Sequence, residues 1–145
     1  MKLDEKDKRV ILILKEDSSL TVSQISKKSK IPITTVHNRI KRLKENGIIK
    51  NYTINLDHEK IGKPIKSYIL VTVNQNKSHP QEEIAEKISK IEDVISTDIV
   101  TGQTDILSVV KTDSIKNLNE IITHKIRNIE GVDKTQTIIV LNEMN

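Results

Sequence analysis

The C-terminal half of the chain contains an internal repeat, which constrains the fold more strongly than any other feature of the sequence. The stretch YILVTVN, starting at Tyr68, aligns with ILSVVKT, starting at Ile106, 38 positions later. The same offset relates IEDV to IEGV at residues 129–132, and the helical stripe Ile84, Ile88 and Ile91 to Ile122, Ile126 and Ile129. Each copy is typical of strand, helix, strand, so the two copies predict a βαββαβ ferredoxin-like sheet with both helices on one face.

The repeat also predicts where the elements lie and how the sheet is covered. The expected strands are residues 66–74, 94–101, 104–112 and 132–142, and the expected helices are residues 80–90 and 114–129. Apolar side chains occupy both faces of residues 69–73 and 137–141, so the sheet face opposite the helices also needs to be buried. A twofold homodimer through that face is the economical solution.

The composition of the 145 residues excludes several classes of protein. There is no cysteine, which rules out disulfides, thiolate zinc sites and cysteine nucleophiles. Tyr52 and Tyr68 are the only aromatic residues, so the chain lacks the stacking platforms on which single-stranded nucleic acids bind. No apolar run is long enough to span a membrane and the charged start is unlike a signal peptide, so we expect a cytoplasmic protein without a membrane partner.

Positive charge is concentrated in one part of the chain. Residues 1–60 carry 14 Lys and Arg against 8 Asp and Glu, whereas residues 61–145 carry 10 against 12. Within residues 27–50, eight basic residues accompany the single acid Glu45. Phosphate contacts provide most of the sequence-independent affinity for nucleic acid, so the cluster indicates a polyanion-binding surface. A charged run is more often a solvated face, so the cluster needs support from the helices around it.

Three short helices are predicted before residue 50. Asp4 is suited to cap the first helix, and Glu5 and Asp7 lie in its first turn, where the helix dipole favours negative charge. Thr21 opens the second helix as part of a T-x-x-Q capping box, and a tight turn at residues 29–32 leads into the third. Two helices joined in this way form a helix-turn-helix, in which the second helix of the pair enters the DNA major groove.

The third helix has two different faces. Val36, Ile40 and Leu43 fall at i, i+4 and i+7 and form one apolar stripe, and Gly47 ends the helix. The other side carries polar and basic side chains, namely Thr34, Thr35, His37, Asn38, Lys41 and Arg42. For a lone helix an ordinary amphipathic surface helix is the commoner explanation, but the basic cluster and the preceding helix favour DNA binding here.

Three motifs carry a resemblance to a known family: the opening L-D-x-x-D, the block R-I-K-R-L-x-x-x-G-I-I from Arg39, and T-G-x-x-D from Thr101. On these motifs and their order, nearly the whole chain resembles the Lrp/AsnC family of transcriptional regulators. The resemblance implies an α+β protein with a hinge strand, near residues 48–56, that contributes to a dimer contact. The implied parts are an N-terminal winged helix-turn-helix domain (1–50), a hinge strand and linker (51–64) and a C-terminal ferredoxin-like, RAM-type domain (65–145).

Two positions before the third helix depart from the family pattern. Lys30 stands where the family has a turn glycine, so a left-handed conformation there would cost about 1 kcal/mol. Pro32 stands where the family has a capping serine. The third helix therefore loses a side-chain cap, and its first N–H groups stay free for water or DNA phosphate.

In a major-groove helix the exposed side chains take two roles. Hydroxyls and amides make directional hydrogen bonds to base edges, whereas positive groups on long stems reach phosphates. The residues suited to base edges are Thr34, Thr35 and Asn38, and those suited to phosphate are His37, Lys41 and Arg42. For Arg39, which lies closer to the apolar stripe, DNA contact and packing over the core are equally favoured. The expected partner is double-stranded DNA with pseudo-palindromic sites, bound by a dimer.

The segment TGQTD permits two interpretations; it comprises Thr101, Gly102, Gln103, Thr104 and Asp105. From the residues alone it is most simply a hairpin turn in which Gly102 supplies a positive φ. The family resemblance implies instead that it lines a pocket for an amino-acid effector between assembled dimers, opposite Thr135 and Thr137 of a neighbour. The family's usual Asp/Asn-Tyr pair is Gln103-Thr104 here, so the pocket is expected to be wider and more polar.

No enzymatic activity, metal or cofactor is expected, because the four histidines lack metal-ligand spacing and no phosphate-binding glycine motif occurs. The leading hypothesis is a sequence-specific DNA-binding transcription regulator that responds to a small molecule, an amino acid. Two alternatives stay open: a DNA-architectural protein with little sequence preference, and a small-molecule-binding regulatory subunit of an enzyme. A comparison of affinity for random and promoter DNA would separate the first two hypotheses. Absence of salt-sensitive DNA binding would favour the third.

Overall fold

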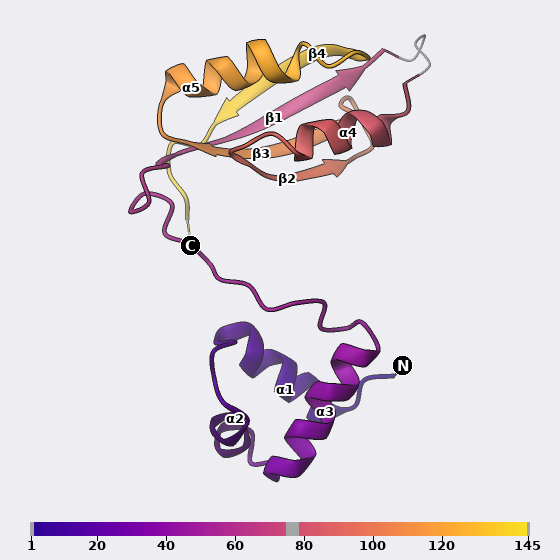
Figure 1. The fold of residues 1–145 in the computed structure, drawn as a ribbon, viewed down its shortest axis with the longest axis vertical. Coiled ribbons are helices and arrows are strands. Elements are labelled where there is room, and N and C mark those ends of the chain that lie inside the picture. Colours follow the sequence, from indigo (N-terminus) through magenta and orange to yellow (C-terminus); the bar gives the residue numbers. More distant parts are fainter. Residues whose placement is uncertain (1, 75–78, 145) are drawn as a thin grey trace. The chain divides into compact units, whose positions relative to one another are not determined.

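The structure is a computed structural model that describes residues 2–74 and 79–144. The chain divides into two compact units, Met1–Asn55 and Leu56–Asn145 (Figure 1). The segment predicted as hinge and linker, residues 51–64, contributes to both. Each unit buries its own cluster of aliphatic side chains.

The N-terminal unit contains three helices, α1 (Glu5–Glu16), α2 (Val22–Ser29) and α3 (Ile33–Glu45). Asp4 and Thr21 cap α1 and α2 as predicted, each in a capping box with the residue three positions further on. The helices enclose a core of buried side chains: Val10, Ile25, Ile31, Val36 and Leu43. The predicted helix-turn-helix is therefore confirmed in its helices and their order.

The turn between α2 and α3 has the geometry that the sequence implied. Lys30 adopts a left-handed conformation with a φ of 55°, which costs a residue with a Cβ atom about 1 kcal/mol. Pro32 makes no side-chain hydrogen bond to the first turn of α3. Buried Ile31 holds the turn in the core, and its carbonyl accepts a hydrogen bond from Ser26 Oγ at 2.6 Å.

The hinge strand predicted near residues 48–56 is absent from the single chain. In the described part of the chain, residues 50–56 form no strand and pair with none. A strand needs a neighbour that satisfies its backbone N–H and C=O groups, and the elements of the N-terminal unit are helices. The prediction was therefore wrong for the single chain, in which these residues have no strand beside them.

The C-terminal unit is a four-stranded antiparallel sheet with its helices on one face (Figure 1). The strands are β1 (Ile65–Val73), β2 (Val94–Ile99), β3 (Ile106–Thr112) and β4 (Val132–Ile139), in the spatial order β2-β3-β1-β4. Helix α4 (Gln81–Ser89) connects β1 to β2. Helix α5 (Ile115–Glu120) continues into a π-helix, η1 (Ile121–Ile126), and leads to β4. This is the βαββαβ arrangement predicted from the repeat.

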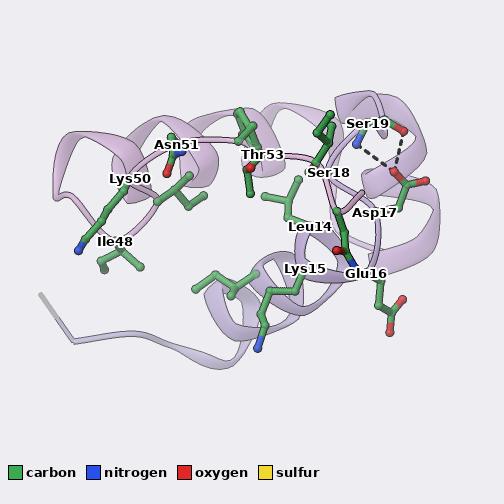
Figure 2. A pocket seen from close by; sticks show the side chains of 15 residues that line it. Leu14, Lys15, Glu16, Asp17, Ser18, Ser19, Ile48, Lys50, Asn51 and Thr53 are labelled. Carbon is green, nitrogen blue, oxygen red and sulfur yellow. Dashed lines mark hydrogen bonds between the residues drawn. The ribbon is translucent and has the colours of Figure 1, made fainter. Parts of the chain in front are cut away.

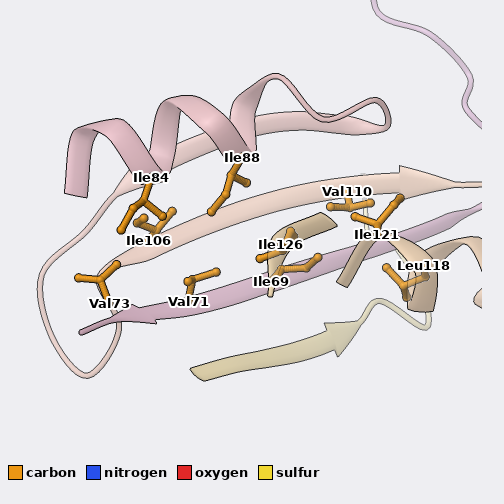
Figure 3. Packing of buried hydrophobic residues seen from close by; sticks show 10 residues of the cluster. All are labelled: Ile69, Val71, Val73, Ile84, Ile88, Ile106, Val110, Leu118, Ile121 and Ile126. Atoms are coloured by element: carbon orange, nitrogen blue, oxygen red, sulfur yellow. The ribbon is translucent and has the colours of Figure 1, made fainter. Parts of the chain in front are cut away.

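The core of this unit lies between the helices and one face of the sheet (Figure 3). On β1 every second residue faces the helices, so Ile69 and Val71 are fully buried. From α4, Ile84 and Ile88 fill the space above β1 and β3. In the described residues of the C-terminal unit, no helix lies over the opposite face of the sheet.

In the second copy of the repeat, the buried face of the helix begins one residue earlier than the predicted stripe of Ile122, Ile126 and Ile129. Ile121 rather than Ile122 is fully buried together with Ile126, a spacing of five residues. The cause is the π-helix, whose hydrogen bonds span five residues, as from Arg127 N to Ile122 O at 3.0 Å. On the strands, Ile106 rather than Leu107 faces the core.

Candidate nucleic-acid interface and effector loop

Helix α3 presents a polar and basic face to solvent because the apolar stripe on its other side packs into the core. Val36 and Leu43 are fully buried, and Ile40 packs against the same cluster. The exposed residues on the other side are Thr34, His37, Asn38, Lys41 and Arg42, while Thr35 and Arg39 are half-buried. The structure therefore brings the predicted DNA-binding residues together on one helix, with two of them partly withdrawn.

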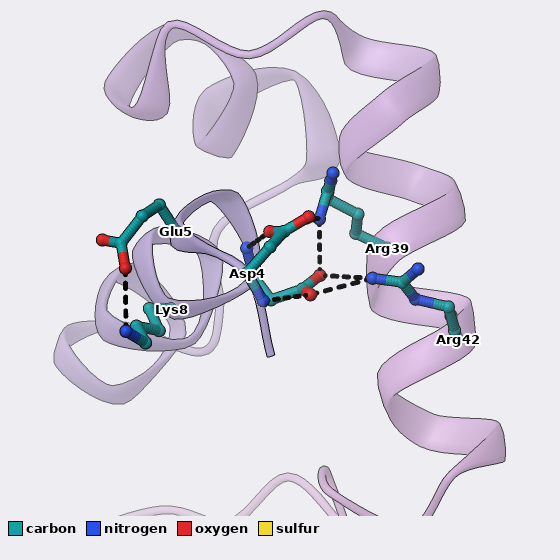
Figure 4. Close-up of polar contacts among 6 residues, drawn as sticks. Asp4, Glu5, Lys8, Arg39 and Arg42 are labelled. Carbon is teal, nitrogen blue, oxygen red and sulfur yellow. Dashed lines mark hydrogen bonds and ion pairs between the residues drawn. The ribbon is translucent and has the colours of Figure 1, made fainter. Parts of the chain in front are cut away.

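Arg39 and Arg42 point from α3 toward the start of α1 (Figure 4). Arg39 Nη1 lies 2.7 Å from Oδ1 of Asp4 and 2.7 Å from Oδ1 of Asp7. Arg42 Nη2 lies 2.8 Å from Oδ2 of Asp7. These four side chains, named here the α1–α3 ion network, join the two helices through charge-assisted hydrogen bonds.

Asp7 lies in the first turn of α1 as predicted, and its side chain is fully buried, which the sequence did not indicate. Burial alone would raise the pKa of Asp7. The N–H of Asp4, at 3.1 Å, and the guanidinium groups of Arg39 and Arg42 outweigh that effect and hold its pKa below the ordinary value. At the exposed carboxyl of Asp4, the hydrogen bond from Arg39 lowers the pKa to about 2.

The network involves two of the residues predicted to bind DNA, Arg39 and Arg42. Arg39, for which DNA contact and packing were equally favoured, packs: its side chain is 17% exposed and is bound by two carboxylates. Arg42 was predicted to contact phosphate, but its guanidinium is bound by Asp7, although 47% of the side chain is exposed. Lys41 is 67% exposed and its Nζ lies 3.8 Å from Oε1 of the exposed Glu45, so it faces solvent as predicted.

The predicted effector loop joins β2 to β3, and its tip differs from its base. At the tip, Thr101, Gly102 and Gln103 are exposed, and Gly102 has a φ of 132°. At the base, Thr104 Oγ1 donates a hydrogen bond to the carbonyl oxygen of Val71 on β1 at 3.2 Å. The tip of the loop is therefore exposed to solvent, whereas its base is hydrogen-bonded to β1.

Asp105, the predicted partner of an effector ammonium, already binds two groups of the chain. Its Oδ2 accepts a hydrogen bond from Val73 N at 2.8 Å, and its Oδ1 accepts one from Gln81 Nε2 at 3.0 Å. The carboxylate therefore connects the end of β1 to the start of α4. These contacts depend on how the strand and the helix pack, which no local sequence motif reveals.

Thr135 and Thr137 lie on β4 and share the sheet face that carries the helices, opposite Val71 and Ile69 of β1. Thr135 Oγ1 accepts a hydrogen bond from Arg127 Nε at 2.8 Å. The effector loop reaches β1 from the β3 side. Within one chain, β1 therefore lies between the loop and the two threonines.

Within residues 2–74 and 79–144, no group of three or more His, Asp or Glu side chains is arranged to hold a metal ion. The same ranges contain no helix whose length and apolar character would let it cross a bilayer.

Family comparisons match both units. A model of the Lrp/AsnC ligand binding domain matches residues 66–145, and a model of a winged helix-turn-helix DNA-binding domain matches residues 3–50. An uncharacterised HTH-type transcriptional regulator of Pyrococcus furiosus is 37% identical over 94% of this chain and 91% of its own length. HTH-type transcriptional regulator FL11 of the same species is 35% identical over 96% of this chain and 89% of its own length.

Solved structures share the fold over the whole chain. LrpC of B. subtilis superposes with a TM-score of 0.87 at 25% identity, covering 100% of this chain and 99% of that one. A transcriptional regulator of Neisseria meningitidis, solved as a complex with L-Met, superposes with a TM-score of 0.92 at 24% identity, covering 99% and 93%. The two matched domains, and the regulators that share over a third of its residues, show that the chain belongs to the Lrp/AsnC family of transcriptional regulators.

Proposed function

We propose that this regulator binds double-stranded DNA sequence-specifically through α3 and that an amino acid modulates its activity. The observation that carries the proposal is the exposed row Thr34, Asn38 and Lys41, which lies on α3 opposite the buried Val36 and Leu43. The major groove admits one α-helix and offers a distinct pattern of donors and acceptors at each base pair. A row that combines hydroxyl, amide and ammonium groups fits such a surface.

Within this row the side chains divide by chemistry. Thr34 and Asn38, with half-buried Thr35 beside them, read base edges, because their donors and acceptors are directional. His37 and Lys41 contact phosphates. The two arginines of the α1–α3 ion network act indirectly, because they fix α3 on α1 and so set the direction in which the row faces.

Asn38→Ala should relax sequence discrimination by roughly 1–3 kcal/mol at one base pair and leave the salt dependence of binding unchanged. Lys41→Ala should do the converse, weakening binding to every sequence and reducing the slope of log K against log salt by about 1. Fluorescence anisotropy at several salt concentrations, with a duplex selected from a random pool and a scrambled duplex, measures both effects. Lys87→Ala, which changes an exposed lysine of α4 in the other unit, is the control. Unchanged discrimination by Asn38→Ala would place base reading on other residues.

The proposed DNA-binding form is a homodimer, and the face of the sheet opposite the helices supports it. Tyr68 and Leu70 on β1 are half-buried and lie beside Val109 and Leu107 on β3, while Ile138 on β4, opposite Tyr68, is 47% exposed. A contiguous apolar face of this kind marks an interface. Two copies packed by this face would present two α3 helices to a pseudo-palindromic site.

A second surface of the proposed dimer lies in the N-terminal unit. Figure 2 shows a hollow of about 910 Å³ between the end of α1 and residues 48–55. Its apolar lining includes Ile11 and Leu14 of α1 and Ile54, which is 75% exposed. The unpaired backbone of residues 50–56 would find a strand partner in a second copy. A monomeric mass by light scattering at micromolar concentration would contradict the dimer.

The proposed effector is an amino acid bound at the loop of residues 101–105. Similarity to the N. meningitidis regulator solved with L-Met supports the class of ligand. Backbone N–H groups around the exposed Gly102 are suited to a carboxylate. A carboxylate offers about four acceptor positions, so Asp105 can bind an ammonium in addition to Val73 and Gln81. Thr135 and Thr137 of a neighbouring dimer would complete the pocket, so ligand binding would be coupled to assembly.

Calorimetry against the standard amino acids should detect binding by the wild-type chain. Asp105→Asn keeps the shape of the side chain and removes its charge, so affinity should fall at least about tenfold, or 1.4 kcal/mol. Asp98→Asn is the control, because Asp98 is an exposed carboxylate on β2. Absence of binding by the wild type, or equal affinity in Asp105→Asn, would mean that the sensing site lies elsewhere.

A further inference from the structure

Lys66 on β1 and Lys111 on β3 lie directly opposite each other on the face of the sheet away from the helices. Their neighbours in the two strands, Ser67, Val110 and Thr112, are fully buried on the helix side, so both lysines point to the other face. Two like charges at opposed positions of neighbouring strands destabilise a sheet. The two lysine side chains are 21% and 17% exposed, so water screens the repulsion between them only in part.

The C-terminal tail, residues 140–144, brings a carboxylate to this lysine pair. Val140 N donates a hydrogen bond to Lys66 O at 2.9 Å, so the tail begins beside β1. Glu143 Oε2 lies 3.2 Å from Lys66 Nζ, and Glu143 Oε1 lies 3.7 Å from Lys111 Nζ. Because β1 lies between β4 and β3, the tail crosses β1 on this face of the sheet.

The two lysines keep the carboxyl group of Glu143 ionised. The hydrogen bond from Lys66 and the positive charge of Lys111 hold the pKa of Glu143 below its ordinary value, although partial burial opposes them. In turn, Glu143 raises the pKa of Lys66. At neutral pH each copy therefore carries two ammonium groups and one carboxylate at this place.

The lysine pair adjoins the apolar residues through which the proposed dimer would form. Lys66 Nζ lies 5.6 Å from the centre of the Tyr68 ring, and Tyr68 belongs to that apolar face. The tail also carries Leu141 and Met144, which are 98% and 90% exposed in the single chain. Glu143 thus holds a segment with two exposed apolar side chains beside the face that a second copy would cover.

We propose that Glu143 neutralises the cross-strand pair Lys66–Lys111 so that a second copy of the chain can pack on this face, and that the tail, residues 140–144, is part of the homodimer interface. The inference rests on the dimer proposed above. Without Glu143, each copy would bring two unneutralised ammonium groups to the contact, and twofold symmetry would place two such pairs in one interface. Like charges brought together in an interface lower its affinity.

Fluorescence-detected sedimentation of the intact chain, diluted from micromolar to picomolar concentration, measures the Kd of the dimer. In Glu143→Gln the Kd should rise at least about tenfold, because one partner of a partly desolvated charge group is lost in both copies. The rise should become smaller as salt is added, because salt screens the repulsion between the lysines. A loss of packing alone would not respond to salt in this way.

A second substitution tests the cause of the loss. Lys111→Met keeps an apolar stem and removes one of the two like charges. In the double variant, Lys111→Met with Glu143→Gln, each copy carries one net positive charge at this place, as the wild type does. Its Kd should therefore return to within about threefold of the wild-type value. Glu86→Gln is the matched control, because Glu86 also pairs with a lysine, Lys90 at 2.6 Å, but lies on α4.

The possible outcomes separate this inference from the proposed dimer. Wild-type affinity in Glu143→Gln, or a double variant as weak as Glu143→Gln, would overturn the role of Glu143 while the dimer stands. An equal loss in Glu86→Gln would also overturn it, because net charge rather than position would then set the affinity. A wild-type chain that stayed monomeric at micromolar concentration would overturn the proposed dimer and this inference together.

Discussion

Replacing Asp7 with alanine should lower the free energy of unfolding of the N-terminal unit by about 3 kcal/mol. Asp7 is fully buried, and its carboxylate binds the guanidinium groups of both Arg39 and Arg42. Its loss would leave Arg39 with only the exposed Asp4 and would take the carboxylate from Arg42. Because Arg42 is about half exposed, water compensates part of the loss, which places the expected value at the low end for buried ion pairs.

Calorimetry of the intact chain measures this change, and hydrogen exchange in α1 and α3 assigns the transition to the N-terminal unit. Glu5→Ala is the matched control, because Glu5 is an exposed carboxylate in the same turn and pairs with Lys8 at 2.8 Å. Loss of such a surface pair costs at most about 1 kcal/mol. Equal losses in the two variants would contradict a structural role for the α1–α3 ion network.

The same network determines how stability responds to acid. In the folded state the pKa values of Asp4 and Asp7 lie below the ordinary value, which is about 3.9 for an unfolded aspartate. The stabilisation is therefore complete above about pH 5 and is lost as the pH falls through the folded-state values, about 2 for Asp4. Asp7→Asn cannot titrate at this position, so its stability should depend less on pH in this window. An equally steep acid response would show that other carboxyl groups dominate it.

Gly131→Ala should destabilise the C-terminal unit by about 3 kcal/mol, for two reasons that add. An added Cβ would lie 2.7 Å from Ile84 Cδ1 and 3.2 Å from His79 Cβ, so the core beside α4 would have to shift. The φ of 97° is also strained for any residue with a Cβ atom. Denaturant unfolding, followed by exchange of the β1 amides, measures the loss.

Gly62→Ala separates the two causes. Gly62 has a φ of 79°, and a Cβ there would meet no atom within 4 Å, so only the backbone penalty of about 1 kcal/mol remains. The difference between the two variants is the cost of the contact with Ile84. If both variants lost the same stability, the close approach of Gly131 to α4 would carry no energetic cost.

Sequence motifs and periodicity predicted the features that depend on residues close together in the chain, such as helix caps and the buried face of α3. Asp4 and Thr21 cap helices in the structure because their side-chain oxygens bind N–H groups within the same turn. The apolar stripe of α3 separated its buried from its exposed side because helical periodicity requires no knowledge of neighbours. The repeat predicted the sheet topology because two strand–helix–strand copies with short connections can combine into only a few sheet topologies.

Contacts between distant segments were harder to predict. The burial of Asp7 depends on which side chains meet when α1 packs on α3, and the spacing of charges along each helix leaves several pairings open. The contacts of Asp105 with Val73 and Gln81 likewise follow from packing. The hinge strand failed as a prediction for a different reason, since the alternating residues have no neighbouring strand in the N-terminal unit with which to pair.

The π-helix η1 bears on how the two halves of the C-terminal unit are related by descent. Core positions at the start of each half correspond at a distance of 37 residues, as Ile69 to Ile106 and Ile84 to Ile121. After the first turn of α4 the distance is 38, as Ile88 to Ile126. The change falls within η1, and a π-turn is the form in which a helix accommodates one additional residue. The unit thus has the form of a duplicated module whose second copy is one residue longer. The π-turn takes up that residue, so β4 begins with the same pattern of burial as β2.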